Sequence, residues 1–133
     1  MLSSFARQAV EIARGDREPE LRVGNLDSVR DFLDVDDVVR AYVALCDANV
    51  PAGVYNVASG RSVRVGDALE RILAIAGVSP RVEVDPARFR PTDHAVGNAE
   101  RLRAATGWEP RVPLERTLER VVAFWHEKLA AAG

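Results

Sequence analysis

Residues 30–37 read Arg-Asp-Phe-Leu-Asp-Val-Asp-Asp, and this stretch decides the fold because it joins an extended segment to a helix. Residues 29–33 are mainly apolar and predict a short strand. Asp34 is a good helix N-cap, and apolar residues recur with helical spacing after it. These apolar positions are Val35, Val38, Val39, Tyr42, Val43 and Leu45. So broad an apolar face predicts a helix that is covered on more than one side.

Upstream of this stretch, the chain begins with an amphipathic segment. Ser3 and Ser4 can cap a helix that ends near Gly15. Its apolar face consists of Phe5, Ala9, Ile12 and Ala13. Residues 16–19 predict a turn, and residues 21–23 predict a short extended piece before the turn at Gly24.

Downstream, residues 53–58 predict a strand and residues 64–76 a third helix, which Gly77 ends. Residues 82–84 predict another short strand, and residues 86–94 an irregular loop.

The rest of the chain is predicted to be helical. Asn98 caps a short helix that ends at Gly107, and Pro113 opens a long amphipathic helix. The predicted inward face of the last helix consists of Leu114, Leu118, Val121, Val122, Phe124, Trp125 and Leu129. The order of elements indicates an α/β fold with few short strands and about five helices.

The glycines do not form a phosphate-binding loop of a known type. None of the nine is spaced as G-x-G-x-x-G or as a P-loop. An α/β chain without such a loop is incomplete as a nucleotide-binding fold.

Composition narrows the class of protein. The chain has 133 residues, 47% hydrophobic and 29% charged, which suffices for one domain with a core. A net charge of −2 argues against nucleic acid or a membrane surface as partner. We find no membrane span and no signal peptide in the sequence. Cys46 is the single cysteine, which we expect to be a small buried hydrophobe, and it favours a reducing, cytoplasmic setting.

Candidate chemistry lies in the histidines and carboxylates. We expect His126 on a solvated helix face; His94 either pairs with a substrate or lies on the surface. The carboxylates are clustered, which suggests a metal site, but attraction to a helix N-terminus explains most of the cluster, so we expect no metal. The cluster consists of Asp31, Asp34, Asp36 and Asp37.

Two arginines and one carboxylate form a second candidate group. Arg30 stands where an extended piece meets a helix, and Arg90 and Asp93 share one loop. A guanidinium fork matches phosphate oxygens, and a carboxylate accepts from ribose or base donors. Salt bridges or solvated arginines would explain the same composition.

Four segments taken together favour the interpretation that these arginines bind phosphate. Residues 30–37 resemble the "RD(F/Y)xxVxD" block of the extended short-chain dehydrogenase/reductases that act on nucleotide sugars, the NAD-dependent epimerase/dehydratase family. Residues 53–60, Gly-Val-Tyr-Asn-Val-Ala-Ser-Gly, resemble its "YN(V/L)xxG" strand. Residues 90–93, Arg-Pro-Thr-Asp, are similar to its "RxxD" loop, and residues 106–110, Thr-Gly-Trp-Glu-Pro, to its "LGWxP" turn. The four blocks occur in the family's order.

Two further segments are most similar to sequences of the GDP-mannose branch of this family. That branch comprises the GDP-mannose 4,6-dehydratases and the GDP-6-deoxy-4-keto-mannose reductases. The two segments are Ser-Ser-Phe-Ala-Arg-Gln at residues 3–8 and Val-Gly-Asn-Leu-Asp at residues 23–27. Asp31-Phe32 replaces the Asp-Trp usual in the dehydratases, which favours the reductase side.

The resemblance implies an incomplete Rossmann-type fold. Residues 1–133 would be a C-terminal substrate-binding portion of an NAD(P)-dependent oxidoreductase or lyase, with the N-terminal dinucleotide-binding domain absent. The family's Tyr-x-x-x-Lys pair is missing, because Cys46 follows Tyr42 at that spacing and Ser59 follows Tyr55. We therefore expect this chain alone to be inactive and to bind no cofactor; NAD or NADP belongs to the full-length parent.

The resemblance also implies roles for individual residues. Arg30 and Arg90 would bind the diphosphate of a nucleotide sugar, with a GDP-sugar favoured. Asp93 would accept a hydrogen bond from a ribose hydroxyl or from the base. Phe5, Val23 and Asn25 would line the nucleobase side.

Other questions stay open at this point. The chain could instead be a stand-alone, non-catalytic module that binds a nucleotide or a protein. The truncation could be natural, deliberate or the result of a misplaced start. Reduction, dehydration and epimerisation remain alternatives. Because a lone strand and a wide apolar helix face need partners, we expect self-association, in the form of a dimer.

Overall fold

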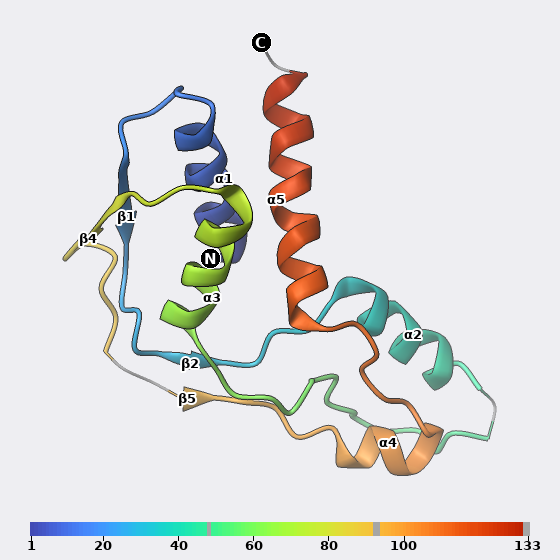
Figure 1. The fold of residues 1–133 in the computed structure, drawn as a ribbon. Helices are drawn as coiled ribbons and strands as arrows, with labels where there is room; N and C mark the ends of the chain where they lie inside the picture. The colour runs from blue at the N-terminus through green and yellow to red at the C-terminus, as the bar shows by residue number, and fades with distance from the viewer. Residues whose placement is uncertain (48, 92–93, 132–133) are drawn as a thin grey trace.

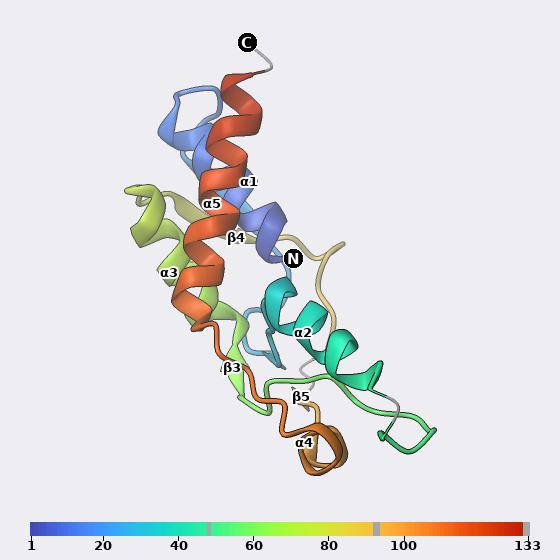
Figure 2. The same ribbon diagram turned by 90° about the vertical axis from the view of Figure 1, so that its right-hand side faces the viewer.

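A larger part built around helices α1 (Leu2–Ala13), α3 (Val65–Ala76) and α5 (Leu114–Ala130) continues into a smaller part with α2 (Val35–Leu45) and α4 (Glu100–Thr106) (Figures 1 and 2). The computed structural model describes residues 1–47, 49–91 and 94–131, and within them the chain forms five helices and five short strands. In chain order these are α1 (Leu2–Ala13), β1 (Glu20–Val23), β2 (Val29–Arg30), α2 (Val35–Leu45), β3 (Val63–Arg64), α3 (Val65–Ala76), β4 (Arg81–Val84), β5 (His94–Ala95), α4 (Glu100–Thr106) and α5 (Leu114–Ala130). The predicted mixed α/β class with few short strands is confirmed.

The strands form two small sheets. β1 pairs in parallel with β4, with Leu21 opposite Val82 and Val23 opposite Val84. β2 lies between β3 and β5, antiparallel to β3 and parallel to β5. The chain after β4 leads to β5, which lies beside β2 (Figure 1).

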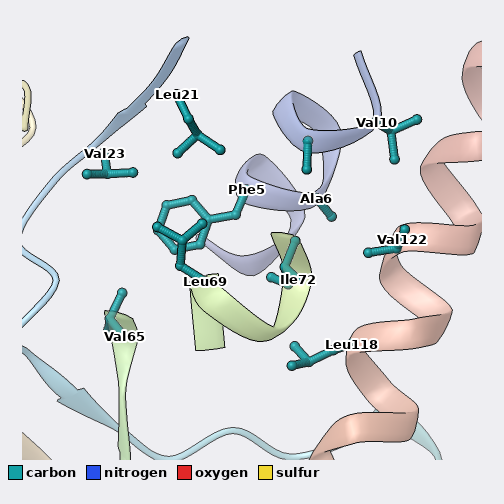
Figure 3. Close-up of a cluster of buried hydrophobic side chains, with 11 residues drawn as sticks. Phe5, Ala6, Val10, Leu21, Val23, Val65, Leu69, Ile72, Leu118 and Val122 are labelled. Carbon is teal, nitrogen blue, oxygen red and sulfur yellow. The ribbon is translucent and has the colours of Figure 1, made fainter. Parts of the chain in front are cut away.

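The larger part has one continuous apolar core between α1, α3, α5 and β1 (Figure 3). Leu21, Ile72 and Leu118 are completely buried in it. Phe5 extends from α1 to lie beside Leu69 of α3. Each such side chain contributes about 1.5–3 kcal/mol when it leaves water, so these elements stabilise one another without a further layer.

The smaller part has a core of mostly small side chains, so polar contacts add to its packing. This core consists of Ala41, Ala58, Ala99, Leu102 and Trp108. The Trp108 indole donates to the backbone carbonyl of Asp37 at 3.0 Å. The Asp37 side chain accepts from the backbone amides of Arg111 and Val112 at 3.1 and 3.0 Å. α2 is thereby tied to the segment that leads into α5.

The predicted helix ends are largely confirmed. Asp34 caps α2 by accepting from the amide of Asp36 at 3.0 Å. Gly77 and Gly107 follow α3 and α4 in the left-handed conformation, at φ +69° and +68°. The predicted cap of α1 was wrong, because the helix already begins at Leu2 and Met1 is its N-cap residue. Ser3 instead accepts from the Trp125 indole at 3.0 Å.

The largest departure from prediction concerns α2 and residues 53–58. Val35 and Val43 are 68% and 69% exposed, so the prediction that α2 is covered on more than one side was wrong for this chain. Residues 53–58 form no strand with the described part of the chain, and Val54 is 81% exposed. The same cause explains both findings: no described element lies against this apolar face or pairs with this segment.

Two single residues also lie elsewhere than expected. Cys46 is exposed rather than buried, because it stands just beyond the end of α2. Phe124 was predicted to face inward, but it is 51% exposed and its ring meets Trp125 edge-on. None of the helices in the described ranges has the length and apolarity needed to cross a membrane.

Candidate functional site

A pocket of about 230 Å³ opens where α1, the β1–β2 turn and the loop after β4 meet. β1 brings Val23 to this place, β2 brings Arg30, and the loop brings Arg90. The lining residues are Met1, Ser4, Phe5, Arg22, Val23, Gly24, Asn25, Ser28, Arg30, Val65, Arg88 and Arg90.

Five of the six predicted site residues lie together in this pocket, although they come from distant parts of the chain. They are Phe5, Val23, Asn25, Arg30 and Arg90. The sixth, Asp93, lies outside the described residues. The sequence blocks around residues 23–30 and 90 thus meet at one place in space.

The inner wall of the pocket is apolar and rigid. Phe5, Val23 and Val65 line it and are at least 95% buried in the main core. The backbone amide of Val65 donates to the carbonyl of Ser28 at 2.9 Å, which fixes the start of α3 against the β1–β2 segment. A flat apolar ligand group would find a preformed surface here.

Arg30 and Arg90 carry positive charge into the pocket. The Arg30 guanidinium donates to the carbonyl of Val29 at 2.9 Å, and that of Arg90 donates to the carbonyl of Phe89 at 3.0 Å. Arg90 forms no ion pair with any residue in the described ranges. Because a guanidinium has five donors, Arg90 retains donors for an anion.

Arg22 and Arg88 stand farther out and are held by carboxylates. Arg22 pairs with Glu20 at 3.0 Å, and the hydrogen bond to Glu20 followed by its charge raises the pKa of Arg22 above its ordinary value. Arg88 lies 3.4 Å from Asp85 and donates to the carbonyl of Arg22 at 3.3 Å. Both arginines thus have a carboxylate close by on the chain.

Asn25 and Gly24 join the β1–β2 turn to the loop after β4. The Asn25 amide donates to the carbonyl of Arg90 at 2.9 Å, and its oxygen accepts from the amide of Asp27 at 2.9 Å. A Cβ at Gly24 would lie 2.5 Å from the carbonyl oxygen of Arg88. The turn therefore requires glycine at position 24, and Asn25 positions the loop that carries Arg90.

Asp31 connects two of the sequence blocks, residues 30–37 and 53–60, to the segment at Gly97. Its carboxylate accepts from the amides of Ser59 and Gly60 at 3.0 and 2.9 Å, and from that of Gly97 at 3.2 Å. The Ser59 hydroxyl donates to it as well, at 2.5 Å. The explanation of this residue by a helix dipole was wrong, because Asp31 binds loop amides instead.

Besides capping α2, Asp34 also binds two residues of α5. It accepts from the Thr117 hydroxyl at 2.7 Å and pairs with Arg120 at 3.2 Å. Burial acts to raise the pKa of Asp34, but the Asp36 amide, the Thr117 hydroxyl and the Arg120 charge outweigh burial. The pKa of Asp34 therefore lies below its ordinary value of 3.8.

Metal-binding groups do not gather within the described ranges. No three His, Cys, Asp or Glu side chains there are arranged to hold a metal ion. His94 and His126 are both exposed, on β5 and on α5. Neither lines the pocket.

Several lining residues were not among the predicted site residues. Arg22 alternates with Val23 along β1, and Arg88 precedes Arg90 by two positions in the loop. Proximity in sequence to predicted residues was the available signal for both. Ser28, two positions before Arg30, had the same signal, but Val65 had none, because it reaches the pocket through the pairing of β2 with β3.

Comparison with known proteins gives consistent matches. A family model described as GDP-mannose 4,6 dehydratase matches residues 2–121. GDP-6-deoxy-D-mannose reductase of Pseudomonas aeruginosa is 34% identical over 131 residues, which are 97% of this chain and 43% of that protein.

Solved structures agree with the sequence matches. The structure of RMD from Pseudomonas aeruginosa complexed with NADPH has a TM-score of 0.88 at 32% identity, over 96% of this chain and 42% of that one. UDP-glucose 4-epimerase from Thermotoga maritima with UDP-glucose has a TM-score of 0.75 at 28% identity, over 91% and 38%.

The chain thus spans less than half the length of these relatives. The family match nevertheless covers most of its residues, including every pocket-lining residue except Met1. The chain belongs to the GDP-mannose 4,6 dehydratase family, within the Rossmann-type NAD-dependent epimerases and dehydratases.

Proposed function

We propose that this pocket binds the diphosphate of a nucleotide sugar, with a GDP-sugar favoured. The observation that carries the proposal is the charge of the lining: four arginines and, among the described lining residues, no carboxylate. Guanidinium forks bind phosphate oxygens through paired, charge-assisted hydrogen bonds. Arg30 and Arg90 are the proposed phosphate ligands.

The apolar wall supports a nucleotide rather than a free phosphate. Phe5 and Val23 present a buried apolar surface beside the arginines, which suits the face of a nucleobase. Asp93 is proposed to accept a hydrogen bond from the ribose. The preference for guanine rests on the family and on the GDP-sugar relative.

The catalytic context is a proposal for the whole protein. We propose that residues 1–133 are the C-terminal substrate-binding portion of a cytoplasmic NAD(P)-dependent reductase, dehydratase or epimerase. The chain's residues do not fit a dinucleotide: neither a glycine-rich βα loop nor a Tyr-x-x-x-Lys pair is present. No hydride or proton transfer is therefore assigned to side chains of this chain.

Calorimetric titration with GDP tests the binding site. Loss of one charge-assisted phosphate contact costs about 1.5–3 kcal/mol, or roughly 10- to 150-fold in affinity, so Arg90→Ala should abolish a weak signal. Arg116→Ala is the matched control, because Arg116 is exposed on α5 and pairs only with Glu119 in the described structure. Equal GDP affinity of wild type and Arg90→Ala would remove the assignment.

A stand-alone module that binds a protein is the second candidate. The exposed apolar residues of α2 favour it, because soluble monomers rarely leave such a face open. The genomic sequence upstream distinguishes the two: an in-frame glycine-rich loop with Tyr-x-x-x-Lys indicates an enzyme portion, and a stop codon the module.

A further inference from the structure

Arg88 is fixed by its backbone at the outer edge of the pocket. The amide of Arg88 donates to the carbonyl of Asp85 at 2.9 Å, and the amide of Ala87 donates to the Asp85 side chain at 2.9 Å. The Arg88 carbonyl packs against Gly24 so closely that a side chain there would collide with it. These contacts make the turn at residues 85–88 a firm base for the arginine.

The Arg88 side chain is held much less firmly than its backbone. It is 53% exposed, and its two polar contacts are long: 3.4 Å to Asp85 and 3.3 Å to the carbonyl of Arg22. Exposed ion pairs of this kind contribute little to stability. The guanidinium can therefore exchange its partners at low cost.

The charge on the two sides of Arg88 differs. Toward the interior lies the pocket, whose described lining carries arginines and no carboxylate. On its outer side Arg88 also borders a shallower hollow that contains Glu18 and Glu20. An anion in the pocket would attract the guanidinium inward, away from the outer carboxylates.

We propose that Arg88 is a third phosphate-binding residue, whose guanidinium leaves Asp85 and binds the diphosphate of the nucleotide. This inference rests on the proposed function, in which Arg30 and Arg90 hold the diphosphate and the base lies on the apolar wall. Arg88 lines the same pocket as Arg90 and comes from the same loop. Asp85 loses its partner at little cost, because its side chain is 27% exposed and retains the Ala87 amide.

Titration of GDP and guanosine into wild type and variants tests the assignment. Arg88→Ala should weaken GDP binding about tenfold, the lower end of the range for a charge-assisted contact, and guanosine binding less than about twofold. Asp85→Asn removes the competing charge but keeps an oxygen for Ala87, so it should strengthen GDP binding about twofold or more. Arg81→Ala removes an arginine that is 78% exposed on β4 and should change neither affinity.

The possible outcomes separate this inference from the proposed function. If Arg90→Ala abolishes GDP binding while Arg88→Ala leaves it unchanged, the role of Arg88 is overturned and the proposed function stands. Equal losses of GDP and guanosine binding in Arg88→Ala would overturn its assignment to the phosphate. Absence of GDP binding by the wild type would overturn both. Arg88→Gln retains the side-chain stem and replaces Arg88→Ala if the latter unfolds more easily.

Discussion

The carboxylates of residues 30–37 act mainly on residues far along the chain. The Asp31 carboxylate accepts hydrogen bonds from the amides of Ser59, Gly60 and Gly97. The Asp37 carboxylate accepts from the amides of Arg111 and Val112. The cap formed by Asp34 and the ion pair of Asp37 with Arg40 are local, and the cap was the role of these carboxylates that the sequence predicted. Contacts between distant residues leave no periodic pattern, so the sequence alone could not indicate the contacts of Asp31 and Asp37 with those amides.

Stability at acid pH should depend on Asp34. Its pKa in the folded chain lies below 3.8, its ordinary value, so its contribution is fully present above pH 3.8 and is lost as pH falls through the folded-state pKa. Chemical unfolding between about pH 6 and pH 3 should show a larger loss of stability for wild type than for Asp34→Asn. Parallel curves for the two proteins would contradict the pairing with Thr117 and Arg120.

Elements with a partner inside the chain were predicted well. α1, α3 and α5 bury one apolar face each against the others. Their helical periodicity was therefore sufficient to predict them as helices and to identify their buried faces. α2 and residues 53–58 have equally strong patterns but no described element to cover them. A pattern predicts that a face needs burial, but it does not say whether the partner belongs to the same chain.

Asp37 is the residue that connects α2 to the start of α5. It is completely buried, pairs with Arg40 and accepts two backbone amides. Asp37→Ala leaves these donors unsatisfied and should lower the free energy of unfolding by about 3 kcal/mol, measured by urea denaturation. Asp67→Ala, on the exposed first turn of α3, should cost less than about 1 kcal/mol. Similar losses in both variants would contradict a special role for Asp37.

At the scale of the whole molecule, the chain has a pocket in one part and an uncovered apolar face in another. The pocket belongs to the larger part, whose core is closed. The uncovered face belongs to the smaller part, in α2 and residues 53–58 (Figure 2). The predicted site could be found from sequence blocks because family motifs mark Arg30 and Arg90. No motif marks Arg22 and Arg88, so only their proximity in sequence to Val23 and Arg90 indicated them, and the pairing of β1 with β4 and the turn after β4 bring them to the pocket.

Self-association is the first expectation at this scale. The exposed residues Val39, Val43 and Val54 should be covered by a second copy, in a dimer in which the helices or the 53–58 segments meet. Light scattering should show a dimer for wild type and a monomer for Val43→Glu. Ala123→Glu, on an exposed position of α5, should remain dimeric. A well-folded wild-type monomer at high micromolar concentration would contradict this expectation.

Lack of turnover is the second expectation. Without the Tyr-x-x-x-Lys pair and the dinucleotide loop, the purified chain should not consume NADPH in the presence of a 4-keto sugar nucleotide. Absorbance of the reduced cofactor should stay constant over time. Steady oxidation that scales with the concentration of the chain would show that other residues perform the chemistry.

The location of bound GDP tests the central claim most directly. Backbone amide chemical shifts of the labelled chain, followed during titration with GDP, report which residues meet the ligand. Binding in the pocket predicts shifts that saturate together at residues 22–30 and 88–90 and leave the exposed face of α2 unchanged. Shifts confined to α2 and residues 53–58, or none at any of the pocket residues, would contradict the account.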